Sequence, residues 1–352
     1  MKIRISKTAI IGIIATILGL FAGGILMIVI GNDPFAGYLY LFSGGLMNIE
    51  RIGNTLATAA PLVFSGLAVA FAFNTGLFNI GASGQMLLGG LCATAIGLTL
   101  NLPKPLLLSL MLLAAMIGGG LWAVIPGYLK AKFNVHEVVS TIMMNWIAYW
   151  VIYYVVPAYF KGPYLETESA KIPQSASLKV EWLTSMFNGS YINLGIFLAI
   201  LAVIIVSIIL NKTILGFELK AAGFNRYAAE YAGMSVNLNI MLSMVISGIL
   251  AGAGGAALYV GYASNIQIGV LPSQGFDGIA ISLLGGNTPV GVFVASLFFG
   301  VLHSGKGFMN AMTNIPPAIG DTIIAIIIYF AATSVLIDRI IYSGRFKIKG
   351  RA

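Results

Sequence analysis

Residues 74–90 read NTGLFNIGASGQMLLGG and lie within a run from Ile52 to Pro103 that contains no charged residue. Such a run is typical of a membrane-embedded segment, yet this stretch holds several glycines, two asparagines and a glutamine. Backbone facing lipid must satisfy its own hydrogen bonds, so irregular backbone at this depth is tolerated only where it packs against protein or lines a wet cavity. We therefore expect a broken helix near residues 74–85, with the other helices arranged around it.

The composition indicates an all-α polytopic membrane protein. Of the 352 residues, 59% are hydrophobic and only 9% are charged, against roughly 25% charged in soluble domains. Several uncharged runs exceed the ~20 residues that cross a bilayer as a helix. The net charge of +8 comes from residues that flank the apolar runs, which fits the positive-inside rule and argues against a nucleic-acid partner.

Hydrophobic runs predict about ten transmembrane helices in a single domain covering residues 1–352. The first run is too long for the apolar core of a signal peptide, so we expect a retained helix there. The first three expected spans cover residues 8–31, residues 53–73, and the stretch that follows the break and ends at about residue 100. The other expected spans cover residues 105–127, 138–160, 191–211, 236–260, 276–286, 289–304 and 319–340. Residues 161–190 and 212–235 form the two long polar connections.

The distribution of Lys and Arg predicts the topology. An even number of spans puts both termini on one side, and most basic residues fall on that side, which the positive-inside rule assigns to the cytoplasm. Loop 161–190 is then extracytoplasmic and loop 212–235 cytoplasmic. The basic residues on the side of the termini are Lys2, Arg4, Lys7, Lys130, Lys132, Lys212, Lys220, Arg226, Arg339, Arg345, Lys347, Lys349 and Arg351.

An internal repeat is possible on two loose similarities. HEVVSTIMMN (136–145) resembles GDTIIAIIIY (320–329), and GQMLLGG (84–90) resembles AISLLGG (280–286). Transporters often contain such repeats, but apolar sequences also match by chance, so both interpretations stay open.

Polar residues within the spans have two possible roles. Amides offer donors and acceptors to a polar solute in a pathway, but they also form hydrogen bonds between helices. Asp277 and Asp321 each begin an expected span, where an acid either caps the helix or marks a functional site. The candidate pathway-lining residues are Asn74, Asn79, Gln85, Asn145 and Asp277.

No set of residues for catalysis or metal binding stands out. Cys92 is the only cysteine, and His136 and His303 are the only histidines, too few for a zinc site by themselves. We expect no catalytic residues, no metal and no cofactor in this chain.

The polar connection 212–235 predicts a short amphipathic helix. FELKAAGFNRYAAEYAGMSV (217–236) contains helix formers, and Arg226 and Glu230 have the i,i+4 spacing of a helical ion pair. Its alanines leave a slim face that another protein could approach closely. A solvated surface helix between two spans is the alternative.

Three stretches resemble one family. FNIGASGQ (78–85), preceded by NTG, is similar to the FNIGAEGQ signature of ABC-transporter permeases in the ribose/branched-chain-amino-acid superfamily, closest to those for guanosine and other nucleosides. Ser83 stands where many members have Glu. FNVHEVVSTIMMNWIA (133–148) resembles the family's N-E-V-x-x-T-I-M-x-N stretch, with Val135 and His136 departing from it. Residues 221–233 resemble its A-x-G-x-N-x-x-A-A-x-x-A-G coupling-helix motif.

The resemblance implies a nucleoside permease, with simple sugars such as ribose or branched-chain amino acids as alternative substrates. It implies ATPase subunits that bind ATP–Mg, a second permease subunit in a heterodimer, an extracytoplasmic substrate-binding protein or lipoprotein, and a place among the lipids of a prokaryotic cell membrane. The chain has no P-loop of its own. An ion-coupled secondary transporter, which needs buried carboxylates, is the alternative of another class. The residues expected to couple to the ATPase are Glu218, Lys220, Ala221, Gly223, Asn225, Arg226, Ala228, Ala229 and Gly233.

Overall fold

A computed structural model describes residues 7–163, 167–313 and 315–333. Within these ranges the chain is helical apart from loops and two isolated β-bridges, so the prediction of an all-α membrane protein is confirmed. The basic residues predicted at the two termini, Lys2, Arg4, Arg339, Arg345, Lys347, Lys349 and Arg351, lie outside the described residues.

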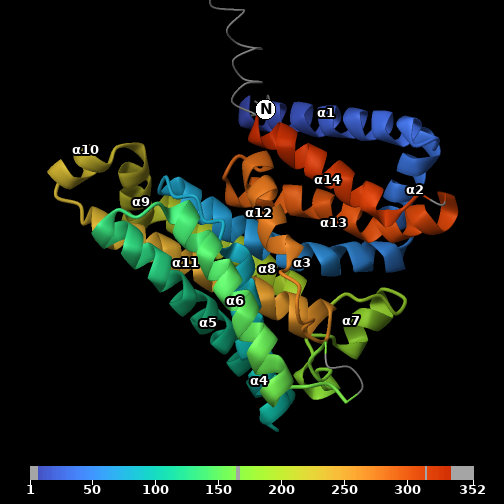
Figure 1. The fold of residues 1–352 in the computed structure, drawn as a ribbon, viewed down its shortest axis with the longest axis horizontal. Helices are drawn as coiled ribbons and strands as arrows, with labels where there is room; N and C mark the ends of the chain where they lie inside the picture. Colours follow the sequence, from blue (N-terminus) through green and yellow to red (C-terminus); the bar gives the residue numbers. More distant parts are fainter. Residues whose placement is uncertain (1–6, 164–166, 314, 334–352) are drawn as a thin grey trace, which may run out of the picture.

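The helices form one bundle whose two ends differ (Figure 1). Helices α9 and α10 lie at one end, called the α9–α10 end, and α7 lies at the opposite end, called the α7 end. The helices are α1 (Lys7–Val29), α2 (Pro34–Leu46), α3 (Ile49–Asn74), α4 (Ala82–Thr99), α5 (Lys104–Phe133), α6 (Glu137–Tyr159), η1 (Gln174–Ala176), α7 (Glu181–Met186), α8 (Gly195–Lys212), α9 (Ile214–Phe224), α10 (Arg226–Tyr231), α11 (Val236–Ala256), η2 (Ala257–Tyr262), α12 (Ser273–Leu284), α13 (Pro289–Thr313) and α14 (Pro317–Ala332).

About ten spans were expected, and the described residues contain eight helices long and apolar enough to cross a membrane. The difference lies in α12, which has 12 residues, and α14, which has 16 described residues. At ~1.5 Å per residue, α12 extends only ~18 Å, well short of the ~30 Å hydrocarbon core.

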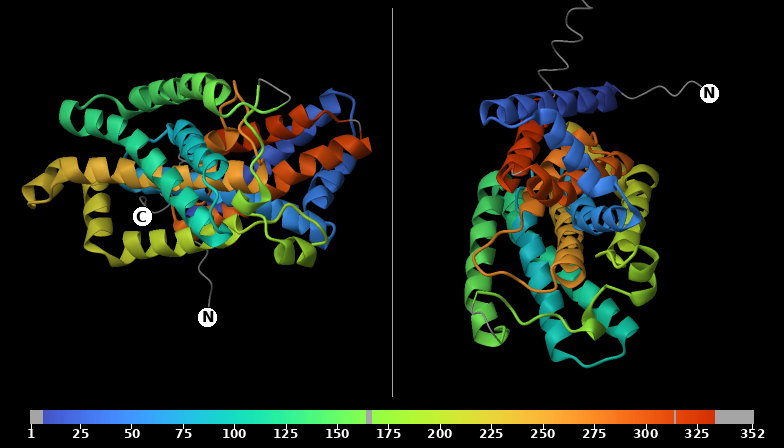
Figure 2. Two further views of the ribbon diagram at one scale, coloured as in Figure 1. Left: turned by 90° about the horizontal axis from the view of Figure 1, so that it is seen from below. Right: turned by 90° about the vertical axis from the view of Figure 1, so that its right-hand side faces the viewer.

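Helix α3 is the centre of the bundle. In the apolar stretch of α3 that is long enough to cross a membrane, 89% of the residues are buried, and α8, α11, α12 and α13 pack around the helix. Close packing depends on small residues: a Cβ added at Gly66 would lie 2.6 Å from Ile281 on α12. In contrast, α1 lies along the outside of the bundle beside α14 (Figure 2).

The broken helix near residues 74–85 is confirmed. Helix α3 ends at Asn74 and α4 begins only at Ala82. Between them the chain runs back along α11: the Thr75 hydroxyl donates to Ser243, and the Asn79 amide donates to Ser247 one turn further along, both at 2.8 Å. Because Ser247 also donates to the carbonyl of Ala68, Asn79 lies beside the interior of α3. Helix α4 therefore begins inside the bundle.

Helix α12 begins beside the start of α4. The Ser83 hydroxyl donates to the carbonyl of Pro272 at 2.8 Å. A Cβ added at Gly275 would lie 2.4 Å from Cα of Ser83. Two helices thus start next to each other within the bundle, an arrangement typical of transporters with discontinuous helices.

Two connections differ from the sequence prediction. In the linker after the first span, Pro34 and the pair Gly44 and Gly45 argue against one continuous helix. Residues 34–46 nevertheless form α2, with Pro34 in its first turn and both glycines packed closely against α13. The polar segment 130–137 was expected to be a loop, but α5 continues to Phe133 and ends at Asn134 with φ 51°. Lys130 and Lys132 stabilise its last turn because cations interact favourably with a helix C-terminus.

Candidate functional site

The segment 212–235 folds as two short helices, α9 and α10, each with a side-chain cap. The Thr213 hydroxyl accepts from the backbone N–H of Gly216 at 3.2 Å, and the Asn225 side chain accepts from the N–H of Ala228 at 3.1 Å. Gly233, with φ +83°, follows α10 in a conformation that favours glycine. The predicted helical segment therefore exists, with a turn at Asn225 that sets its two halves at an angle.

The charged residues of this segment hold it to the neighbouring helices. Glu218 accepts from Asn239 on α11 at 3.0 Å, and Lys220 donates to Asn211 on α8 at 3.0 Å. Arg226 was expected to pair with Glu230, but it donates to Asn237 at 2.8 Å. These predicted coupling residues position α9 and α10 on the bundle.

The outward face of the segment is aromatic. Phe224 is 95% exposed, Tyr227 is 82% exposed and Tyr231 is 97% exposed. Aromatic residues anchor many protein interfaces because they bury a large area with few rotatable bonds. The sequence prediction named the small and charged residues and missed these three, although aromatics in a polar connection between two spans were the available signal. We call Phe224, Tyr227 and Tyr231 the aromatic tip.

The inner side of the segment contacts the break between α3 and α4. A Cβ added at Gly223 would lie 2.7 Å from the carbonyl oxygen of Asn74 and 2.9 Å from the backbone nitrogen of Gly76. Gly76 itself has φ +71°. The absence of a side chain at Gly223 permits this backbone-to-backbone contact. Two stretches singled out separately in the sequence are therefore in direct contact.

Most of the polar side chains of the break are buried and form hydrogen bonds. Asn79 is 0% exposed, and its amide donates to Gln85 and Ser247 while its oxygen accepts from the N–H of Gly81. Asn145 on α6 accepts from the N–H of Gly84 and donates to the carbonyl of Ile80. These bonds satisfy the irregular backbone, as membrane depth requires. Whether the same amides line a pathway in another conformation stays a prediction.

Asn74 links the break to the end of α12. Its amide donates to the carbonyl of Ala70 at 2.8 Å and to that of Asn287 at 3.2 Å. Asn287, with φ 54°, follows α12 in the turn to α13. The contact at Gly223 therefore lies next to a bond that reaches the second discontinuous helix.

The acidic residues of α12 and α14 pair with bases. Asp277 lies inside α12, one turn after its start, so the capping explanation is wrong. Its carboxylate contacts Nε2 of His303 on α13 at 3.1 Å. Asp321 likewise lies inside α14, contacting Lys306 at 2.5 Å. The sequence did not reveal the pairing of Asp277, because its partner lies on a different helix.

Glu137 is the first residue of α6. Its carboxylate contacts Nζ of Lys130 at 2.9 Å across the turn between α5 and α6. The basic neighbour and the N-terminus of α6 both stabilise an acid at this position.

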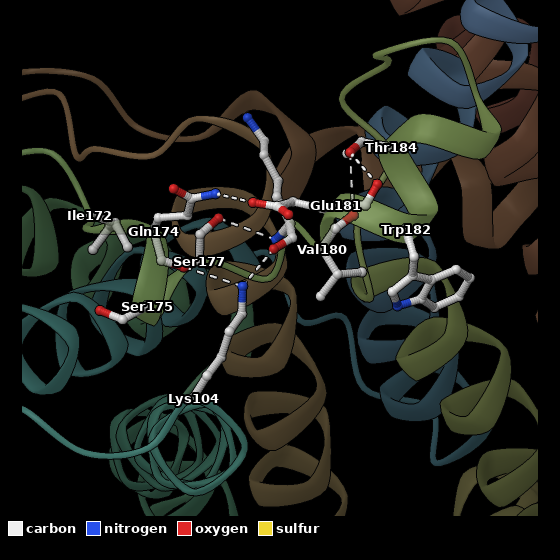
Figure 3. A pocket seen from close by; sticks show the side chains of 10 residues that line it. Lys104, Ile172, Gln174, Ser175, Ser177, Val180, Glu181, Trp182 and Thr184 are labelled. Atoms are coloured by element: carbon white, nitrogen blue, oxygen red, sulfur yellow. Dashed lines mark hydrogen bonds between the residues drawn. The ribbon is translucent and has the colours of Figure 1, made fainter.

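A pocket of about 920 Å³ lies at the α7 end (Figure 3). Lys104, at the start of α5, donates to the carbonyl oxygens of Gln174 and Lys179 at 3.2 and 2.7 Å. Gln174 donates to Glu181 at 3.2 Å. Burial lowers the pKa of Lys179. These bonds fasten residues 174–181 to the start of α5, while Trp182 remains 57% exposed at the rim.

Comparison with known proteins places the chain among transport proteins. Residues 51–332 match the family model described as "Branched-chain amino acid transport system / permease component". The guanosine ABC transporter permease protein NupP of Bacillus subtilis (strain 168) is 44% identical over 339 residues, covering 96% of each chain. The nucleoside ABC transporter permease protein NupB of Lactococcus lactis subsp. cremoris (strain MG1363) is 38% identical over 341 residues, covering 95% of this chain and 93% of the relative.

A second type of relative aligns over a smaller part of the chain. The guanosine ABC transporter permease protein NupQ, also from Bacillus subtilis (strain 168), is 30% identical over 266 residues, covering 71% of this chain and 79% of the relative. One organism therefore has two guanosine permease proteins that both resemble this chain.

Proposed function

Because this chain belongs to the family of branched-chain amino acid transport system permease components, as a multi-pass permease subunit of an ABC importer, we propose that it imports nucleosides, with purine nucleosides foremost. The similarity to NupP and NupB supports this substrate class. The likeness to both NupP and NupQ supports a heterodimer with a second permease subunit.

The proposed orientation places the α9–α10 end and both termini in the cytoplasm. There the aromatic tip binds an ATPase subunit, which holds ATP and Mg²⁺ and supplies the energy. The observation that carries this proposal is the contact of Gly223 with Asn74 and Gly76. Through this contact, a push on α9 and α10 reaches the broken helix without passing through flexible side chains.

The proposed extracytoplasmic side is the α7 end. Loop 161–194, fastened by Lys104, gives this side a firm surface, onto which a substrate-binding protein or lipoprotein delivers its cargo. Domain assignments follow from this orientation: loop 161–190 is extracytoplasmic, loop 212–235 is the cytoplasmic coupling loop, and residues 1–352 are a single permease domain.

Uptake of labelled guanosine by cells that express the importer tests the proposal. We expect competition by unlabelled nucleosides and none by ribose or leucine. ATP depletion abolishes uptake, whereas collapse of the ion gradients at constant ATP leaves it intact. An ion-coupled transporter gives the reverse, and competition by ribose or leucine identifies one of the other substrate classes.

A further inference from the structure

A second pocket lies at the α7 end, distinct from the one fastened by Lys104. It has a volume of about 320 Å³, near the lower end of the ~300–1,000 Å³ typical of small-molecule sites. Helices α3 and α13, the segment before α8 and the end of η2 supply its walls. The residues that line it include Arg51, Asn54, Tyr191, Tyr262 and His303.

Two tyrosines give the pocket aromatic walls. The rings of Tyr191 and Tyr262 meet edge to face, with centroids 6.3 Å apart and planes at 66°. They are 57% and 39% exposed. The ammonium of Lys179 covers one face of Tyr191, 4.9 Å from the ring centroid, which leaves the other face of Tyr191 and the ring of Tyr262 for a solute. An exposed ring face in a polar pocket favours a flat aromatic ligand, because stacking on a base contributes about 1–3 kcal/mol.

The wall formed by the start of α3 carries hydrogen-bond donors. The side-chain oxygen of Asn54 accepts from the backbone N–H of Tyr191 at 2.8 Å. This bond settles the orientation of the amide, so its NH₂ group is the part left for a ligand. Asn54 lies three residues after Arg51, which puts both side chains on one face of the helix.

Arg51 is a second donor in this wall. Its guanidinium lies over the ring of Phe308, 4.8 Å from the centroid. Among the described residues no carboxylate pairs with Arg51. The nearby ammonium of Lys306, by comparison, is already paired with Asp321. The wall therefore offers donors from Arg51 and Asn54 and requires acceptors from its ligand.

His303 connects this pocket with the discontinuous helix α12. Its Nε2 contacts Asp277, which lies on α12. Helix α12 in turn begins beside the start of α4. A solute in the pocket would thus be linked through His303 and Asp277 to α12, one of the two helices that begin inside the bundle.

The geometry points to this pocket as a binding subsite for a 6-oxopurine nucleoside, whose base stacks on Tyr191 or Tyr262 and turns its O6 and N7 acceptors toward Arg51 and Asn54. Arginine recognises this edge of guanine through the same two acceptors. Adenine carries an amino donor in place of O6 and would leave a donor unpaired, which is unfavourable. This inference rests on the proposed import of nucleosides and narrows the substrate to guanosine and inosine.

The test measures nucleoside binding to the complete importer in lipid nanodiscs. The substrate-binding protein is left out, so that the measured binding is not binding to that protein. Equilibrium dialysis compares labelled guanosine, inosine, adenosine and ribose. Asn54→Asp keeps the oxygen that accepts from Tyr191 but replaces the free donor by an acceptor. Asn101→Asp makes the same change at an exposed turn of the same end, outside the pocket.

We expect the wild type to prefer guanosine and inosine to adenosine by about tenfold, the ratio that ~1.4 kcal/mol produces. Asn54→Asp lowers guanosine affinity and reduces that preference, while Asn101→Asp changes neither. Arg51→Lys, which removes the planar fork but keeps the charge, gives an independent loss of guanosine binding. Tyr191→Ala weakens binding of both purines alike.

Guanosine affinity that is unchanged in both Asn54→Asp and Arg51→Lys overturns the subsite, as does ribose competing as well as guanosine. These results are distinct from failure of the proposed function, in which the wild-type importer takes up no nucleoside at all. If the wild-type importer takes up guanosine and the Asn54→Asp and Arg51→Lys variants bind guanosine as tightly as the wild type, the proposed function stands and the subsite is wrong.

Discussion

Gly223 of α9 lies against Gly76 in the break between α3 and α4, and a Cβ added at Gly76 would lie 3.3 Å from Cα of Gly223. The two residues belong to the stretches that most resemble ABC permeases, one in a membrane-depth break and the other in the loop between α8 and α11. Their contact joins the surface where an ATPase would act to the interior of the bundle.

The aromatic tip is expected to hold the ATPase. Replacing Tyr231 by Ala removes a ring that is 97% exposed, so folding is unaffected while binding weakens. A residue that anchors an interface contributes about 2 kcal/mol or more, which lowers affinity by at least roughly thirtyfold. Co-purification of the ATPase measures this.

The matched control is Tyr159→Ala, which removes a tyrosine that is 72% exposed at the C-terminal end of α6, away from α9 and α10. It should leave ATPase recovery unchanged. Equal recovery with both variants would show that the tip is not the docking surface.

Asn79 is expected to stabilise the break. Asn79→Leu leaves the buried backbone N–H of Gly81 without its acceptor and removes the hydrogen bond that the Ser247 hydroxyl oxygen accepts. An unsatisfied buried polar group costs about 1–3 kcal/mol, so thermal unfolding of the purified protein in detergent should begin at a lower temperature. The exposed Asn101→Leu serves as the control, and equal melting temperatures for the two variants would contradict this role.

Ser83 is expected to tolerate only small replacements. Its side chain is 0% exposed, and Gly275 approaches so closely that a Cβ there would lie 2.4 Å from Cα of Ser83. Ser83→Glu, which introduces a longer, charged side chain, therefore overpacks the start of α4 and costs about 1–3 kcal/mol or more. Ser83→Ala loses one hydrogen bond and costs about 1 kcal/mol.

Membrane yield and melting temperature of the two Ser83 variants provide the measurement. A Ser83→Glu protein as stable as Ser83→Ala would mean that the start of α4 has room for a longer side chain, and that the close approach of α12 does not restrict this position.

Local sequence was sufficient for the break and for the helical character of the coupling loop. Amides and glycines in an uncharged run conflict with a continuous lipid-facing helix, so the break at residues 75–81 could be predicted. The start and end of most spans followed from the apolar runs. In each case the deciding physical chemistry acts between residues close together in the chain.

Contacts between distant residues could not be predicted. Asp277 pairs with His303, 26 positions away, and nothing local distinguishes this pair from a helix cap. The burial of the α2 glycines against α13 likewise depends on packing. The segment 276–286 was predicted at close to the observed length of α12, but its apolar sequence alone does not show that this short helix begins inside the bundle.

The central claim is that α9 and α10 transmit the work of the ATPase to the broken helix. Guanosine uptake and ATP hydrolysis, measured together in proteoliposomes that contain the complete importer, test it most directly with Gly223→Ala. The control is Gly24→Ala, where an added Cβ would meet nothing closer than 3.6 Å. We predict that Gly223→Ala continues to hydrolyse ATP while uptake per ATP falls about tenfold, the effect of ~1.4 kcal/mol on the transition. Uptake per ATP equal to that of Gly24→Ala would contradict the account.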